Sequence, residues 1–600
     1  MRTFVFSLVL MSFGTLFAQK TISGIVSDDS GPLPGVSIII KGTRTGTETD
    51  FDGKYTIQAQ VGNVLVYSYV GKMTIEKTVG TSNTMDVLMA DNNNVLDEVV
   101  VVSYGYSAPT TGLFNKKRDK KEKYSASTVV YQEPNNESYS NISENIFKTP
   151  LKDPLSTFSI DVDKASYSNV RRMINNGEKV PNDAVKIEEM INYFNYNYAQ
   201  PVDEHPFAIH SETAVCPWNE EHVLVKIGLQ GKTIEMENLP ASNLVFLIDV
   251  SGSMQDVNKL PLLKSAFKLL VNQLREKDKV AIVVYAGAAG VVLEPTSGDQ
   301  KEKIISALDQ LQAGGSTAGA AGIQLAYQLA EKHFKEKGNN RVILATDGDF
   351  NVGTSSDSDL EKLIEEKRKS GVFLTVLGFG MGNYKDSKLE TLADKGNGNH
   401  AYIDNMQEAQ KVLGTEFGGT LFTIAKDVKI QVEFNPNKVQ AYRLIGYENR
   451  LLNDEDFVDD TIDAGEIGSG HTVTALYEVI PQGIKSKFTK DLPSLKYSNT
   501  EPNPTFESEL LTVKFRYKKP DQDESIELIK IVPDTVKSVS ETPDDFRFAA
   551  SVAMFGMQLR SSEFKGKTDY DQIIELASKA KGKDQDGYKS EFVRLVKAVK

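Results

Sequence analysis

The chain has 600 residues, of which 40% are hydrophobic and 25% are charged, as in ordinary soluble globular proteins. This composition excludes a disordered, collagen-like or multi-span membrane chain, and the length suggests roughly four domains. A formal net charge of −14 argues against general nucleic-acid binding, which needs clustered positive charge. The single cysteine, Cys216, excludes an internal disulfide and a cysteine-based zinc site, and we expect it to pack rather than react.

Residues 1–18 have the features of an export signal. Arg2 supplies the positive charge, residues 4–17 are mostly apolar, and Ala18 is a small residue at a plausible cleavage site. No cysteine follows the apolar stretch, which argues against the usual lipid anchor. No later stretch reaches about 18 uninterrupted apolar residues, so we expect no transmembrane helix. The expected location is the periplasm, the outer membrane or the medium.

Residues 19–90 predict a small β-sandwich, because short alternating apolar runs are separated by turns rich in Gly, Pro and Asp. The runs are residues 21–26, 36–41, 55–59 and 64–67. The sequence TISGIVSDDSGPLPGVSIIIKGTRTGTETDFDGKYTI resembles the carboxypeptidase-regulatory-like module of exported bacterial proteins.

Residues 91–155 are predicted to form a linker. Its segment from Leu96 to Tyr106, LDEVVVVSYGY, resembles the stretch that follows the same module in TonB-dependent outer-membrane receptors. There the stretch can add as a β-strand to a TonB-like partner protein. No plug or barrel follows here, so a leftover edge strand is the alternative. The basic run at 116–123, KKRDKKEK, is either solvated or in contact with anionic lipid.

Residues 241–416 alternate apolar strands with helical patterns, which predicts a doubly wound, Rossmann-like parallel sheet flanked by helices. The expected strands are 243–249, 280–285, 341–346, 372–378 and 400–403. The expected helices are 258–275, 299–311, 319–337, 357–370 and 386–395.

Five oxygen-bearing side chains lie in loops that follow these strands. In open α/β sheets, ligands bind at the carboxyl ends of the strands. Asp249, Ser251 and Ser253 follow the first strand, Thr317 opens a later helix, and Asp347 follows the strand at 341–346. Two carboxylates and three hydroxyls suit Mg²⁺, with Mn²⁺ or Ca²⁺ possible. An open coordination position would accept a carboxylate from a partner protein.

The pattern DxSxS, then Thr, then Asp resembles the metal-ion-dependent adhesion site of the von Willebrand factor type A (vWA) domain. All five positions match. The resemblance implies that Ser251 and Ser253 bind the ion directly, and that Thr317 binds directly or through water. Asp249 and Asp347 would act mainly through water. The alternative is a vWA domain that has lost its metal.

The flanking regions are residues 156–240, 417–535 and 536–600. The first has helices at 166–176 and 184–194 before strands in 207–233. The second is β-rich, with expected strands at 428–434, 439–447, 471–479 and 510–517. The third is helical, and Thr542 is the expected N-cap of its first helix, with Pro543 as the first helical residue. Residues 158–198 and 545–597 resemble the regions around the vWA domain in a group of bacterial exported proteins, the YfbK type. We expect strands from both sides to pair into one β-sandwich, into which the α/β domain is inserted.

The sequence therefore predicts a multidomain α/β and all-β protein: a vWA domain flanked by β-sandwich elements, a small N-terminal β-sandwich and C-terminal helices. The main hypothesis is an exported, metal-dependent scaffold that binds an acidic group of a partner protein. A structural or assembly role in the cell envelope is the alternative. An enzyme ranks third, because HExxH, GxSxG and phosphate-loop motifs are absent from the sequence. His222, His333 and His400 have no local partner pattern, so we expect surface or structural roles.

Overall fold

The computed structural model divides the chain into two compact units, residues 1–129 and 130–600. It describes residues 20–28, 31–33, 36–43, 45–50, 52–69, 72–90, 136–286, 289–314, 319–348, 357–416, 422–462, 464–489 and 504–600. The predicted export signal and the segment from Leu96 to Tyr106 lie outside these residues.

The described part of the first unit is a small β-sandwich, as the sequence predicts. One sheet has the order β2-β1-β5, with β8 added to β1, and the other has the order β4-β3-β6-β7. Both sheets contribute to one core, which includes Ile22, Val36, Ile57 and Tyr67. The strands are β1 (Lys20–Asp28), β2 (Gly31–Pro32), β3 (Ser37–Ile40), β4 (Gly46–Glu48), β5 (Lys54–Ala59), β6 (Val64–Ser68), β7 (Ile75–Thr78) and β8 (Val87–Leu88).

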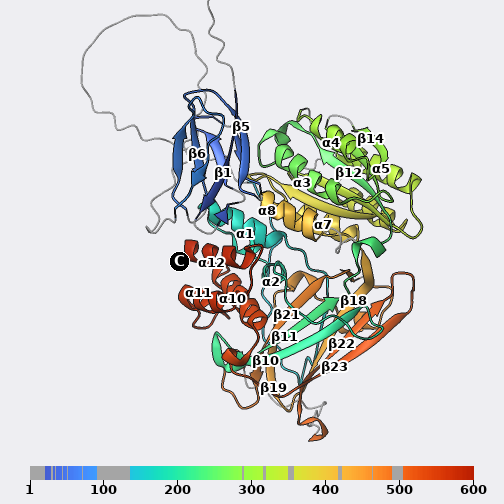
Figure 1. The fold of residues 1–600 in the computed structure, drawn as a ribbon. Helices are drawn as coiled ribbons and strands as arrows, with labels where there is room; N and C mark the ends of the chain where they lie inside the picture. Colours follow the sequence, from blue (N-terminus) through green and yellow to red (C-terminus); the bar gives the residue numbers. More distant parts are fainter. Residues whose placement is uncertain are drawn as a thin grey trace, which may run out of the picture. The chain divides into compact units, whose positions relative to one another are not determined.

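The second unit contains a six-stranded sheet of order β14-β13-β12-β15-β16-β17 (Figure 1). All neighbouring strands are parallel except β14, which is antiparallel to β13. The sequence did not predict this edge strand, because it contains Gly290 and Pro295, which break regular patterns but are tolerated at an edge. The strands are β12 (Ser242–Asp249), β13 (Lys279–Tyr285), β14 (Ala289–Ser297), β15 (Asn339–Thr346), β16 (Phe373–Phe379) and β17 (His400–Ile403).

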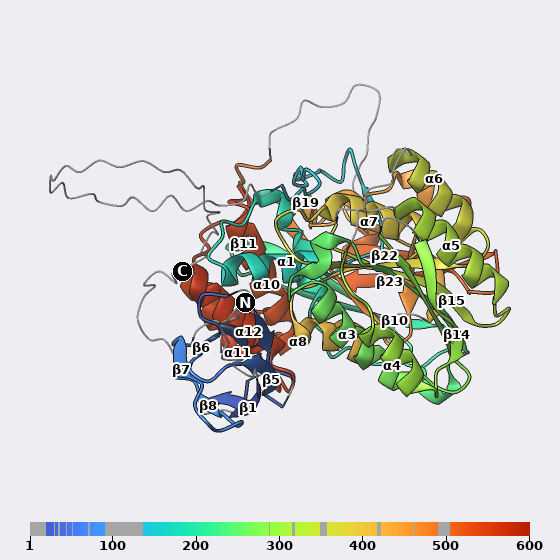
Figure 2. The same ribbon diagram turned by 90° about the horizontal axis from the view of Figure 1, so that it is seen from above.

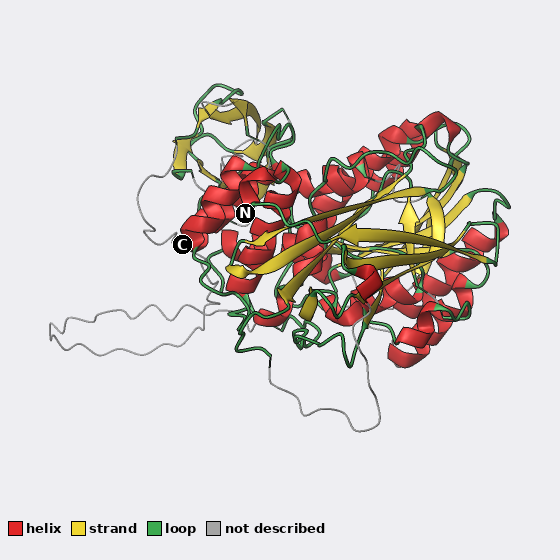
Figure 3. Cartoon of the chain, turned by 90° about the horizontal axis from the view of Figure 1, so that it is seen from below, coloured by secondary structure: helices red, strands yellow, loops and turns green. Residues whose placement is uncertain are grey.

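Helices cover both faces of this sheet (Figures 2 and 3). Alternate side chains of a buried strand face opposite sides: Phe246 packs with α3 and α4, whereas Leu247 packs with α5, α6 and α7. This arrangement confirms the predicted doubly wound domain. The helices are α3 (Leu260–Gln273), α4 (Lys301–Asp309), α5 (Gly319–Lys332), α6 (Asp357–Arg368), α7 (Asp386–Lys395) and α8 (Met406–Ala409), which continues as a π-helix (Gln410–Thr415).

Strands from both sides of the α/β domain form one β-sandwich. Its sheets have the orders β10-β11-β21-β19 and β20-β18-β22-β23, with β9 paired to β18. β11 precedes the α/β domain and pairs antiparallel with β21, which follows it. The strands are β9 (Leu155–Ser159), β10 (Phe207–Cys216), β11 (Asn219–Gly231), β18 (Thr423–Phe434), β19 (Val439–Ile445), β20 (Gly465–Gly468), β21 (Thr472–Pro481), β22 (Glu509–Lys518) and β23 (Ser525–Pro533). The two sheets share a core, so the α/β domain is inserted as the sequence predicts.

A helical layer packs on the sheet that contains β10 and β11 (Figure 1). It comprises α1 (Ala165–Asn175), α2 (Ile187–Asn192), α10 (Asp544–Leu559), α11 (Tyr570–Lys579) and α12 (Tyr588–Val599). We expected Thr542 to cap α10, but its hydroxyl instead donates to the Val539 carbonyl at 2.7 Å, and the helix begins after Pro543.

Within the described part of the chain, no helix has the length and apolarity of a membrane span.

The linker prediction is wrong for residues 136–155, which pack on the second unit. The Asn136 N–H donates to the Gly382 carbonyl at 2.8 Å, and the Lys148 N–H donates to the Tyr442 carbonyl at 2.9 Å. These contacts use the backbone, so apolar periodicity could not indicate them.

Candidate metal centre

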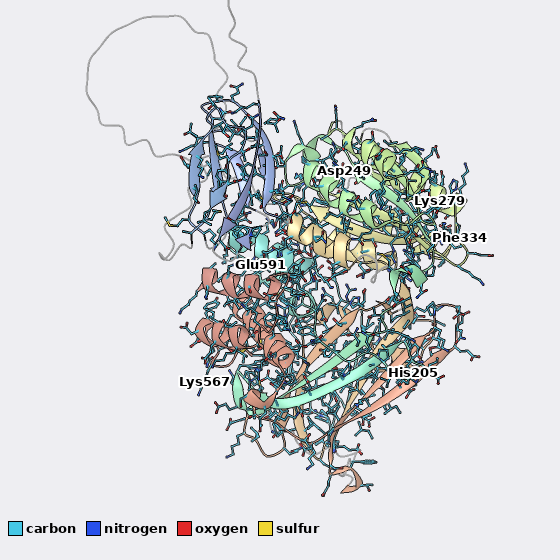
Figure 4. The ribbon with its side chains drawn as sticks, viewed as in Figure 1. His205, Asp249, Lys279, Phe334, Lys567 and Glu591 are labelled. Atoms are coloured by element: carbon cyan, nitrogen blue, oxygen red, sulfur yellow. The ribbon has the colours of Figure 1, made fainter. Side chains whose placement is uncertain are left out.

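Four of the five predicted metal ligands are described by the structure, and they lie at the carboxyl edge of the α/β sheet, where the strand order reverses. From β12 the chain continues to β13 on one side, and later returns to β15 on the other side. Loops that leave such neighbouring strands diverge, and ligands bind in the crevice between them. Asp249 ends β12 at this edge, and Lys279 begins β13 at the opposite edge (Figure 4).

The Asp249 carboxylate is buried, and both of its oxygens accept hydrogen bonds. The Ser251 N–H donates to Oδ1 at 2.8 Å, and the Thr346 hydroxyl donates to Oδ2 at 3.2 Å. Burial raises the pKa of Asp249 to about 6; the hydrogen bonds from Ser251 oppose this rise, and the nearby charge of Asp347 adds to it. A cation next to Asp249 would therefore stabilise its ionised form.

A short turn brings the two serine hydroxyls together. Residues Gly252–Gln255 form a 3₁₀ helix (η3), in which the buried Met254 donates its N–H to the Ser251 carbonyl at 3.0 Å. Ser251 Oγ and Ser253 Oγ lie 3.0 Å apart. Ser251 is buried and Ser253 is exposed, so the site has a face open to solvent.

Asp347 follows β15 and pairs with a lysine from the start of α3. Lys259 Nζ lies 3.0 Å from Asp347 Oδ2, and both residues are buried. Gly348 has φ +91°, and a Cβ there would lie 2.6 Å from the Lys385 nitrogen, so the turn after Asp347 needs glycine. A Cβ on Gly380 would lie 2.4 Å from Lys259 Cε, so this glycine leaves room for the lysine.

Thr317 lies outside the described residues, and its part in the site stays a prediction. The nearest described residues of its loop are Gly314 and Gly319. The Gly314 N–H donates to the Val250 carbonyl at 2.7 Å, which holds this end of the loop next to Asp249.

The donor atoms fit a hard divalent cation. Neighbouring ligands of an octahedral Mg²⁺ lie about 3 Å apart, because each bond is about 2.1 Å long. Ser251 Oγ and Ser253 Oγ have this separation. The four described side chains at the site offer only oxygen, which suits Mg²⁺, Mn²⁺ and Ca²⁺. Lys259 would compete with the cation for Asp347.

Sequence reasoning missed two residues of the site, Lys259 and Thr346. Thr346 stands directly before Asp347 at the end of an apolar run, so its position was a usable signal. Lys259 is separated from Asp347 by 88 residues, and nothing in the local pattern indicates their contact.

A second acidic group lies in the interior of the unit. Asp163, Glu189 and Glu390 have carboxylate oxygens within 4.8 Å of one another. Lys186 Nζ lies 3.1 Å from Glu189 and 2.9 Å from Glu390, and Arg450 lies 3.1 Å from Asp163. Asp161, Asp386 and Asp394 also pair with these two cations. We call these eight residues the Lys186–Arg450 network; its six acids share two protein cations, which lie among the carboxylates where a metal ion would bind.

Cys216, His222 and His400, the residues that could act as a nucleophile or a base, are all buried in packed regions of the protein. Cys216 is fully buried, and burial raises the pKa of its thiol. His222 lies 2.6 Å from Glu478, on the face of the sheet that packs against the helical layer. His400 lies 2.7 Å from the Tyr384 hydroxyl, and burial lowers its pKa to about 4. These contacts agree with packing rather than catalysis.

Family models match most of the chain. Residues 22–101 match a CarboxypepD_reg-like domain, and residues 133–226 match a model described as von Willebrand factor. Residues 243–415 match the von Willebrand factor type A domain, and residues 419–600 match the model "Uncharacterized protein YfbK, C-terminal". The α/β domain is thus of the vWA type, which supports a protein-interaction scaffold in general terms.

The similar proteins cover the chain unequally. The uncharacterized protein YfbK of Escherichia coli (strain K12) is 45% identical over 476 residues, which are 77% of this chain and 81% of that protein. The TonB-dependent receptor P26 of Formosa agariphila is 52% identical over 96 residues, which are 16% of this chain and only 10% of the receptor. Among solved structures, von Willebrand factor type A from Catenulispora acidiphila has a TM-score of 0.36 and 15% identity, over 64% of this chain and 90% of that one.

The similarity to the Escherichia coli protein is long enough to include the flanks of the vWA domain as well as the domain itself. The match to the C-terminal model covers the later sandwich strands and the helices α10 to α12. The chain therefore belongs to the YfbK family of vWA-domain proteins.

Proposed function

We propose that this protein is an exported scaffold that binds a partner protein through a divalent cation. The cation is held at the carboxyl edge of the vWA sheet, with Mg²⁺ as the first choice and Mn²⁺ or Ca²⁺ as alternatives. The partner supplies a carboxylate that completes the coordination. The ligands are Asp249, Ser251, Ser253, Thr317 and Asp347.

The observation that carries the proposal is a set of oxygen donors at the point where the strand order reverses. Asp249 and Ser251 are buried there, and the hydroxyl of Ser253, 3.0 Å from that of Ser251, belongs to an exposed residue. A cation held on this side would be accessible to a group from another molecule. A fully enclosed site would not allow this.

The neutral hydroxyls and the charged carboxylates would have different roles at the metal. Ser251 and Ser253 would hold the ion directly, and Thr317 directly or through water. Asp249 and Asp347 would offset its charge, mainly through bound water. The ion would act as a Lewis acid for the partner's carboxylate. Lys259 keeps Asp347 paired whenever the ion is absent.

A structural or assembly role in the cell envelope is the second candidate. The observation that favours it is the ion pair between Lys259 and Asp347, 3.0 Å apart, which gives Asp347 a cationic partner from the protein itself. In that case the metal only stabilises the loops of the vWA domain, and the two β-sandwiches make the contacts with other envelope components. An enzymatic role ranks third, because the candidate nucleophile and bases pack as structural residues.

Export and location belong to the same proposal. Residues 1–18 support export to the periplasm, to the outer membrane or to the medium. The similarity of the N-terminal region to TonB-dependent receptors supports a contact between the segment from Leu96 to Tyr106 and a TonB-like or outer-membrane protein. A strand-forming segment of this kind would tether the scaffold close to the outer membrane.

Cross-linking in native cell envelopes tests the proposal. The full chain is incubated with envelopes in Mg²⁺ or in EDTA, and the captured proteins are identified. We expect EDTA and Asp249→Ala each to abolish capture, whereas Glu302→Ala, an exposed acid on α4, leaves it intact. Capture that survives both treatments would exclude a metal-dependent contact. If Mg²⁺ raises only the melting temperature, the structural role is supported instead.

A further inference from the structure

A cavity of about 200 Å³ lies at the other, amino edge of the vWA sheet, between that sheet and the β-sandwich. Arg341 from the start of β15 and Asn399 before β17 line it from the vWA side. Glu466 from β20 and His471 before β21 line it from the sandwich side. The cavity is thus formed by two domains and is separate from the metal centre.

Arg341 is a buried cation that makes no salt bridge with the described residues, and the strongest named charge that acts on it is that of Glu466. It is 2% exposed, and its Nη1 donates to the Thr375 hydroxyl at 2.8 Å. Its Nε has no hydrogen-bond partner among the residues that the structure describes, and it forms no ion pair with a carboxylate in that part of the chain. Burial lowers the pKa of Arg341 to about 10, so the guanidinium stays charged at neutral pH. An unpaired buried charge is costly, and a bound anion would relieve that cost.

Two further atoms of the cavity wall lack partners in the described part of the chain: His471 Nε2 and Asp394 Oδ1. His471 is neutral at physiological pH, because burial lowers its pKa to about 4. The other oxygen of Asp394 accepts from Arg450 at 2.7 Å, and Oδ1 remains as an acceptor. The cavity therefore contains an unpaired cation and, on another wall, an unfilled carboxylate oxygen.

The size and charge of the cavity define the class of ligand. A volume of about 200 Å³ is below the usual range of sites for drug-sized molecules, which is roughly 300–1,000 Å³, so the ligand is small. Three acids, Asp161, Asp394 and Glu466, line the cavity against two cations, Arg341 and Arg450, so a dianion such as phosphate would meet a net negative lining. A carboxylate matches the planar guanidinium and carries one charge.

We infer that this cavity binds a small zwitterion of the α-amino-acid class. Its carboxylate pairs with Arg341 and accepts a hydrogen bond from His471, and its ammonium group donates to Asp394. The inference does not depend on the metal centre, because none of these residues belongs to it. Binding is therefore measured in EDTA, where a failure of the cation proposal has no influence.

Calorimetric titration of the full chain with glycine, L-alanine, acetate, methylammonium and phosphate tests this inference. We expect glycine or L-alanine to bind at least ten-fold more tightly than the other three. Arg341→Met, which keeps the length of the side chain, should weaken amino-acid binding about ten- to hundred-fold. Lys279→Met, at the same edge of the sheet but away from the cavity, is the matched control and should have no effect.

A second variant keeps the test decisive if Arg341→Met does not fold. Asp394→Asn should weaken the binding of glycine and leave that of acetate unchanged. Circular dichroism checks the fold of each variant. The inference is overturned if neither amino acid binds at millimolar concentration, if acetate binds as tightly as glycine, or if a folded Arg341→Met variant retains full affinity.

Discussion

Two groups of acidic side chains in the second unit differ in what compensates their charge. In the Lys186–Arg450 network, Lys186 Nζ lies within 3.1 Å of Glu189, Asp386 and Glu390, and Arg450 pairs with four carboxylates. At the carboxyl edge of the vWA sheet, Asp347 pairs with Lys259, and Asp249 accepts from the Thr346 hydroxyl and the Ser251 N–H.

This difference shows that a high density of acids does not by itself indicate a metal site. An ammonium group fixed among three carboxylates occupies the position that a metal ion would take and supplies part of the positive charge. Among the described residues the vWA edge has fewer acids than the network, but it adds two serine hydroxyl oxygens at a distance that suits neighbouring metal ligands. The Lys186–Arg450 network and the vWA edge therefore differ in the groups that face their acids: protein cations in the network, and hydroxyls, backbone N–H groups and one lysine at the vWA edge. The variants below test this difference.

The largest effect is expected in the network. Lys186→Met removes the cation that three buried carboxylates share, so we expect the free energy of unfolding at pH 7 to fall by about 3–5 kcal/mol. Urea denaturation followed by the fluorescence of Trp218, the only tryptophan of the chain, measures it. A loss below about 1 kcal/mol would mean that Lys186 does not compensate these acids.

A buried acid next to the network should show a dependence on pH. Burial, followed by the charge of Glu448, raises the pKa of Glu188 to about 7 from its usual 4.5. Its contribution to stability is therefore fully present below pH 4.5 and is lost as the pH rises through 7. Glu188→Gln imitates the protonated form and should stabilise by about 1–3 kcal/mol at pH 8 and hardly at pH 4. Equal gains at the two pH values would contradict this reasoning.

A smaller effect is expected at Asp249, whose pKa burial raises to about 6. Its ionised form is therefore unfavourable without a cation, and stability falls as the pH rises through 6. In EDTA at pH 8, Asp249→Asn should stabilise the fold by about 1–2 kcal/mol. The same variant should no longer be stabilised by Mg²⁺ in thermal melts. If Mg²⁺ raises the melting temperature of both proteins equally, Asp249 does not contribute to the site.

The smallest effect is expected at Lys259, which competes with the proposed cation for Asp347. Lys259→Met should increase the affinity for Mg²⁺ about three- to ten-fold, which calorimetry can measure. Lys268→Met, another lysine of α3 that pairs with Asp309, is the matched control. A weaker affinity in Lys259→Met would show that the lysine holds Asp347 in position rather than competing.

The sequence predicted those elements whose apolar pattern is strong. β12 and β15 are continuous apolar runs, and both were found within a few residues. β14 and β23 were missed, because edge strands are partly exposed and their patterns are mixed. The start of α10 was wrong because the hydroxyl of Thr542 bonds backwards to Val539.

The sequence predicted the motif residues of the candidate site but not their surroundings. Asp249, Ser251, Ser253 and Asp347 follow strands, so topology alone assigns them to one edge. Lys259 pairs with Asp347, and Arg341 is buried without a salt bridge to the described residues, because of tertiary packing between distant segments. No local pattern encodes these contacts, and Thr317 remains a prediction.

The central claim is that a divalent cation binds at the carboxyl edge of the vWA sheet. Its most direct test is calorimetric titration of the full chain with Mg²⁺, after EDTA treatment and removal of the chelator. We predict one saturable site that disappears in Asp249→Ala and in the double variant Ser251→Ala with Ser253→Ala, and that persists in Glu302→Ala. Absence of saturable binding in the unmodified chain, or unchanged binding in Asp249→Ala, would contradict the claim.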